Sequence, residues 1–130
     1  MSPEVVRKKL AALSIYLSDL KIHENASHGD FMKRHYEVER LLELLLMTAS
    51  DIVFHLLTAK GEPAPSSYRA AFLRAGEIGL ISRELSANLA LGAGLRNILV
   101  HEYAEIDYDL LHKSIPSALR DMTAFIKELS

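Results

Sequence analysis

The segment that most constrains this fold runs from about Phe31 to Ala59, because its second half is apolar in nearly every direction around a helix. The apolar residues there are Val38, Leu41, Leu42, Leu44, Leu45, Leu46, Met47, Ile52, Val53, Leu56 and Leu57. A helix that is hydrophobic all round must be buried on more than one side. We therefore expect this helix to face the core on one side and a partner subunit on another.

The rest of the chain also has helical spacing, and no stretch alternates as a strand would. The run from Ser2 to Glu4 indicates a helix start, since it combines a cap residue, a proline and an acid in the first turn. Further helices are expected from about Ser67 to Glu77, after a cap at Ser82, and after a cap at Asp107 as far as about Leu129. The sequence therefore predicts an all-α antiparallel bundle of four to five helices, in a single domain over residues 1–130.

Three features interrupt these helical patterns. The polar run His23 to Asp30 is expected to be a connection between helices. Gly92 and Gly94 lie inside the fourth expected helix, where they indicate a kink, a close contact with another helix or a functional constraint. Pro116 is expected to kink or divide the last helix, because proline cannot donate the backbone hydrogen bond of a helix interior.

Composition excludes several classes of protein. The 130 residues include no cysteine, which removes disulfides, cysteine nucleophiles and cysteine-based metal sites and fits a reducing cytosol. The net charge of −2 provides no global basic field for nucleic acid, so any contact with RNA must come from a local patch. No signal-peptide pattern and no unbroken apolar run of about 18 residues is found, so we expect a cytoplasmic protein without a membrane segment. Histidine and acid spacings indicate no metal site and no cofactor.

The polar run in the fourth helix reads L-R-N-I-L-V-H-E-Y, from Leu95 to Tyr103. At about 100° per residue, Arg96, Asn97 and His101 share one arc, and the apolar residues of the same turns mark the opposite arc as the core side. Tyr103 falls on the Arg96 side. The angles therefore predict a polar surface on this helix that faces away from the core.

These residue types suit the cleavage of RNA without a metal. Arginine binds phosphate oxygens and is always charged, and histidine gains or loses a proton near neutral pH. Arg96 would stabilise charge on the phosphate, His101 would transfer a proton and Asn97 would orient the imidazole. A full cycle needs two proton-transfer groups, so two subunits facing each other would complete the site. By spacing alone the pattern has low specificity, and a polar seam between helices or subunits is the more frequent explanation.

The same run resembles the signature of HepT-type proteins, which are HEPN-domain toxins. Their pattern is Arg, a polar residue, three more residues, His, any residue and Tyr, followed by a nearby Ile-Asp. It is matched by Arg96, Asn97, His101, Tyr103, Ile106 and Asp107. The segments 51–56, 65–69 and 79–81 are also similar to the family, so the resemblance covers about Val38 to Leu129.

The resemblance implies a dimeric HEPN bundle in which two Arg-His motifs meet at a cleft between subunits. It implies an endoribonuclease toxin that needs no metal, with Arg96, His101 and Asn97 in its catalytic site. The implied partner is an MntA-type nucleotidyltransferase antitoxin that transfers AMP to Tyr103, where the added bulk and negative charge would repel an RNA phosphate. HEPN domains also occur as non-catalytic partners of nucleotidyltransferases or as nucleotide-binding modules, so a binding module is the alternative.

Two further polar residues are candidates for a supporting role. Asp51 and His55 are four residues apart on the second expected helix and could pair with each other. They are candidates for a second layer around the catalytic site or for contact with RNA, although a satisfied polar pair in a packed helix is the commoner arrangement. A basic groove beside the cleft could be formed by Lys33, Arg34, Arg40, Arg69, Arg74 and Arg83, which are more often solvated side chains.

Overall fold

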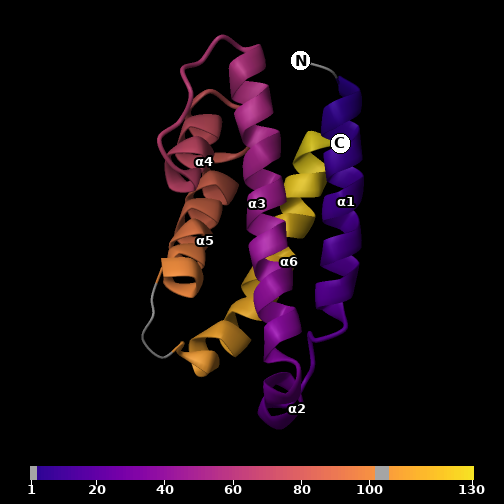
Figure 1. The fold of residues 1–130 in the computed structure, drawn as a ribbon. Helices are drawn as coiled ribbons and strands as arrows, with labels where there is room; N and C mark the ends of the chain where they lie inside the picture. The colour runs from indigo at the N-terminus through magenta and orange to yellow at the C-terminus, as the bar shows by residue number, and fades with distance from the viewer. Residues whose placement is uncertain (1–2, 102–105) are drawn as a thin grey trace.

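A computed structural model of the chain describes residues 3–101 and 106–130, and for residues 95–101 it describes the course of the backbone alone. Over these residues the chain forms six helices and no strand. The helices are α1 (Pro3–Lys21), α2 (His28–Lys33), α3 (His35–Ala59), α4 (Tyr68–Glu77), α5 (Arg83–His101) and α6 (Tyr108–Leu129). In Figure 1, α1 and α5 run downward while α3 and α6 run upward. The predicted all-α antiparallel bundle is confirmed.

The helix α3 lies at the centre of the bundle and contacts all five other helices (Figure 1). Its buried apolar side chains point to several sides; they are Val38, Leu41, Leu42, Leu45, Leu46, Ala49, Ile52, Val53 and Leu57. The all-round apolar pattern is therefore explained within one subunit, and it does not by itself require a partner. Among the described residues, α3 is also the one helix long and apolar enough to cross a membrane, by length and composition alone, and 56% of that window is buried inside the bundle.

The short helix α2 corrects the prediction of a plain connection over His23 to Asp30 followed by one helix from Phe31. The Ser27 hydroxyl caps α2 by accepting a hydrogen bond from the Asp30 backbone N–H at 3.2 Å. Arg34 then leaves helical geometry, with φ −127° and ψ 21°, and separates α2 from α3. The helix is held by Phe31, which is fully buried and stacks on the His112 ring with centroids 4.7 Å apart.

Three predicted helix starts are confirmed by their caps. Backbone N–H groups donate to the side chains of Ser67, Ser82 and Asp107 over 3.0 to 3.2 Å. The prediction was that Pro116 kinks or divides the last helix; the helix is continuous through Pro116, so the proline does not divide it. Residues before and after the proline, among them Ile115 and Leu119, are buried in the same core, and this packing holds both halves in one helix.

The first turns of α5 are fixed by a close contact with α4. The Ser86 hydroxyl donates to the Phe72 carbonyl at 2.7 Å, and Gly76 leaves room for it, because a Cβ added at Gly76 would overlap Ser86 Cβ and Oγ. Gly92 is different, since an added Cβ would meet Leu46 Cδ2 at an ordinary 3.8 Å. The close helix contact anticipated at Gly92 or Gly94 is therefore made by Gly76.

Candidate functional site

The predicted catalytic positions lie at the C-terminal end of α5. Arg96, Asn97 and His101 fall within its last two turns, and the helix ends at His101. Tyr103, the predicted modification site, lies outside the described residues. The next described helix, α6, begins at Tyr108 (Figure 1).

The earlier turns of α5 show which side of this helix faces the bundle. The buried positions are Leu85, Ser86, Leu89, Ala90 and Ala93, and the exposed positions are Glu84, Ala87, Leu91 and Gly94. The side chains of residues 95–101 lie outside the part of the chain that the structure describes, so the outward arc of Arg96, Asn97 and His101 stays a prediction.

The register between α3 and α5 shows what else reaches this end of the bundle. Gly92 lies against Leu46, and the two helices are antiparallel (Figure 1). At about 1.5 Å per residue, α5 descends about 13 Å from Gly92 to His101 and α3 descends about 16 Å from Leu46 to His35. The end of α5 therefore points towards the end of the bundle where α3 and α6 begin (Figure 1).

An aromatic cluster of His35, Tyr36 and Tyr108 occupies this end. The His35 ring lies 4.0 Å from the Tyr36 ring and 4.8 Å from the Tyr108 ring, which it meets edge-on. His35 Nδ1 is 2.7 Å from Glu39 Oε2, which fixes the orientation of the imidazole. Burial, with smaller effects from Glu39 and Tyr36, raises the pKa of the Tyr108 hydroxyl above its ordinary value. Tyr36 closes the cluster on the solvent side and is 78% exposed.

Sequence reasoning missed this cluster. His35 and Tyr36 stand next to each other, but Tyr108 follows far along the chain, after the Asp107 cap. No spacing rule connects a residue at the start of one helix with a residue at the start of another. The adjacent His-Tyr pair in an otherwise charged segment was the one available signal.

Asp51 and His55 lie on the other half of α3, beyond Leu46. Asp51 Oδ2 is 3.6 Å from Lys9 Nζ of α1, so its carboxylate faces α1. By helix rise, Asp51 is about 7 Å above the level of Leu46 and Arg96 is about 6 Å below it. The backbone of one subunit therefore does not bring Asp51 or the half-buried His55 to the motif.

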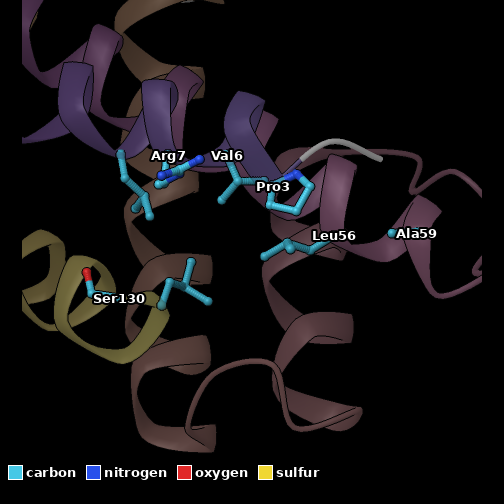
Figure 2. A pocket seen from close by; sticks show the side chains of 8 residues that line it. Pro3, Val6, Arg7, Leu56, Ala59 and Ser130 are labelled. Carbon is cyan, nitrogen blue, oxygen red and sulfur yellow. The ribbon is translucent and has the colours of Figure 1, made fainter.

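A large apolar cavity of about 610 Å³ lies at the opposite end of the bundle, between the start of α1 and the ends of α3 and α6. Figure 2 shows Val6, Pro3 and Leu56 on its wall, with Arg7 at its edge. It offers no histidine and no acidic side chain, so it does not provide proton transfer. Among the described residues, no group of three or more histidine or acidic side chains is placed to hold a metal ion.

Comparison with known proteins agrees with the fold. The tRNA nuclease HepT of Aphanizomenon flos-aquae is 30% identical over the whole chain and 90% of its own length. The mRNA nuclease HepT of Shewanella oneidensis is 36% identical over 58% of the chain and 57% of its own length. The solved structure of the tri-AMPylated S. oneidensis HEPN toxin in complex with its MNT antitoxin matches with a TM-score of 0.86 and 25% identity, covering 99% of this chain and 98% of that one. The family model of ribonuclease HepT-like proteins matches residues 9–129, and the chain belongs to this family.

Proposed function

We propose that this chain is an endoribonuclease toxin of the cytoplasm that cleaves RNA without a metal ion and is neutralised by a nucleotidyltransferase antitoxin. The observation that carries the proposal is the motif Arg96-x4-His101-x-Tyr103 at the end of α5. It occurs in a chain that is similar over its whole length to a tRNA nuclease. Arg96 and His101 are the proposed catalytic residues, Asn97 orients His101, and Tyr103 is the proposed site of modification.

In the proposed reaction, a ribose 2′-oxygen attacks the neighbouring phosphorus, a P–O2′ bond forms and the P–O5′ bond breaks. A histidine takes the proton of the 2′-hydroxyl, and an acid gives a proton to the departing O5′. The guanidinium of Arg96 stabilises the charge that builds up on the phosphate oxygens. Since each chain supplies one motif histidine, a second copy of the chain supplies the other proton-transfer group.

The outward side of α5 supports a dimer that brings two motifs together. Leu91 is 72% exposed, and Gly94 beside it has open space around it. In the sequence, Leu95 and Ile98 follow Leu91 by four and seven positions, which is the spacing of an apolar stripe. Large apolar side chains gathered on one exposed side favour contact with another protein surface. Two α5 helices packed through this stripe would place their last turns, and the two motifs, next to each other.

The proposed regulation acts through charge. An AMP group on Tyr103 would carry negative phosphate close to Arg96 in the sequence, where it would compete with the phosphate of an RNA strand. A solved relative is a tri-AMPylated HEPN toxin in complex with an MNT antitoxin. The proposed partner of this chain is accordingly a nucleotidyltransferase of the same kind, which modifies Tyr103.

The nuclease is tested with purified protein, single-stranded RNA and EDTA in excess over any metal. We expect cleavage that falls about 10²- to 10⁴-fold in His101→Ala and about 10²- to 10³-fold in Arg96→Ala. The matched control is Arg7→Ala, an exposed arginine in the first turns of α1, which should cleave like the unmodified protein. Equal activity in the unmodified protein and His101→Ala, or no cleavage at all, would refute the catalytic role and favour a non-catalytic HEPN binding module.

The modification is tested separately by intact mass after co-expression with the antitoxin. We expect a mass increase of one or more AMP units that is absent in Tyr103→Phe. Tyr108→Phe is the matched control, since it removes a neighbouring phenol that lies in the aromatic cluster and should leave the mass increase in place. A mass increase that persists in Tyr103→Phe would remove Tyr103 from this role and would leave the nuclease proposal intact.

A further inference from the structure

We propose that the aromatic cluster of His35, Tyr36 and Tyr108 binds an unpaired base of the RNA, which stacks on the Tyr36 ring. The inference rests on the proposed function, because it names the form of RNA that the chain recognises: single-stranded, with a base free to leave its neighbours. Proteins that recognise single-stranded RNA stack its bases on tyrosine, histidine and similar rings. The cluster lies where α3 and α6 begin, at the end of the bundle towards which α5 runs (Figure 1).

The Tyr36 ring is exposed on one side and is supported by neighbouring side chains on the other. The ring is 78% exposed and has the His35 imidazole 4.0 Å behind it. The imidazole is held in turn by Glu39 at 2.7 Å and by the edge of Tyr108 at 4.8 Å. A ring supported in this way loses little freedom when a base stacks on it, so less of the stacking energy is spent on ordering the side chain.

The charges around the ring favour an anionic strand over a protein surface. Lys33, Arg34 and Arg40 surround Tyr36 in the sequence and are exposed, and of these Arg34 lies 4.0 Å from Glu37 and Arg40 lies 3.4 Å from Glu43. The Lys33 ammonium has no ion-pair partner among the residues that the structure describes. The centre of a protein interface is depleted of charged residues, whereas phosphates of RNA attract them. An exposed aromatic ring flanked by cations therefore matches a nucleotide better than an apolar partner.

The acidic residues of the same segment are already engaged. Glu39 is held by His35, and Glu37 Oε2 lies 3.0 Å from Nε2 of the buried His23. Glu43 lies 3.4 Å from Arg40. Because these carboxylates are paired within the protein, they repel a phosphate beside Tyr36 less than unpaired carboxylates would.

The test uses Tyr36→Trp, because the chain contains no tryptophan and the substitution introduces a single fluorescent reporter at an exposed position. The ligand is an oligouridylate with 2′-O-methyl groups, which lacks the 2′-hydroxyl and cannot be cleaved by the proposed reaction. We expect binding to quench the introduced tryptophan, as a stacked base does. The matched control is Ile15→Trp, which places the same reporter at a 61% exposed position of α1 and should not be quenched.

A second measurement removes the ring. We expect Tyr36→Ala to bind the same oligonucleotide about 5- to 150-fold more weakly than the unmodified protein, whereas Tyr36→Phe binds within about twofold. Both substitutions are at an exposed side chain, and circular dichroism checks that the helices are retained. Unchanged affinity in Tyr36→Ala, or quenching in Ile15→Trp equal to that in Tyr36→Trp, overturns the proposal.

The outcomes separate this inference from the proposed nuclease. Quenching of Tyr36→Trp by RNA without any cleavage by the unmodified protein would support the base-binding site and refute the nuclease. Cleavage without quenching would refute the base-binding site alone. Quenching by the antitoxin and not by the oligonucleotide would also refute it, since the ring would then belong to a protein interface.

Discussion

Replacing Gly76 by alanine tests how α5 is held in place. In most helices this change is favourable by about 1 kcal/mol, because alanine has the higher helix propensity. Here the added methyl group would overlap both Cβ and Oγ of Ser86, and Cβ is attached directly to the backbone of α5. The overlap can be relieved only by moving α5 away from α4, and overpacking of this kind costs about 1–3 kcal/mol. The shift would also weaken the 2.7 Å hydrogen bond from Ser86 to the Phe72 carbonyl, worth about 1 kcal/mol.

These contributions leave a net loss of about 2 kcal/mol in the free energy of unfolding. For a chain of this size that corresponds to a fall in Tm of roughly 5–8 °C, measured by differential scanning calorimetry. Gly92→Ala is the matched control, since its added methyl group meets Leu46 at an ordinary 3.8 Å. It should raise stability by about 0.5–1 kcal/mol through helix propensity alone.

A double substitution tests the cause. Ser86→Gly removes the atoms that the Gly76→Ala methyl group would meet, and by itself it should destabilise the protein through a lost hydrogen bond and a glycine in α5. In the double variant the two changes should cost less than the sum of the single changes. If Gly76→Ala is as stable as the unmodified protein, or the two changes are additive, the reasoning about this contact is refuted.

Three further predictions concern the dimer, a helix cap and an alkaline transition. Leu91→Glu should convert the proposed dimer to a monomer by light scattering, and a dimeric Leu91→Glu would exclude the outward side of α5 as the interface. Asp107→Ala removes the cap of α6 and should lower the free energy of unfolding by about 0.5–2 kcal/mol in denaturant titrations. An unchanged free energy of unfolding would contradict a stabilising role of this cap. Because burial raises the pKa of Tyr108, its contribution to stability is complete below about pH 10 and is lost as the pH rises above that value. Tyr108→Phe should therefore lose less stability than the unmodified protein as the pH rises above about 10, and parallel curves would contradict this.

The helix ends were predictable because they depend on local chemistry. A serine or aspartate cap satisfies backbone N–H groups within three residues, as Ser67 and Asp107 do. The helix α2 depends instead on a distant contact, since Phe31 is buried against His112 of α6. With a glycine among its six residues it has no stripe long enough to be recognised in the sequence. Its existence could be found only from the packed bundle.

The candidate site was predictable in part for a similar reason. The motif from Arg96 to Tyr103 is contiguous, so its residue types and spacing are visible in the sequence. Which side of the first turns of α5 faces the bundle is set by their contact with α4 through Ser86 and Phe72, which no local pattern connects. The sequence likewise showed that α3 is apolar all round, but it could not distinguish neighbours in the same chain from a partner subunit.

The central position of α3 has a consequence for synthesis of the chain. Two of the helices that cover it, α5 and α6, follow it in the sequence and leave the ribosome later. Until they arrive, the nascent chain exposes a helix with the length and composition of a membrane span, which can associate with other nascent chains or with chaperones. Slow addition of the last third of the chain would prolong this exposure.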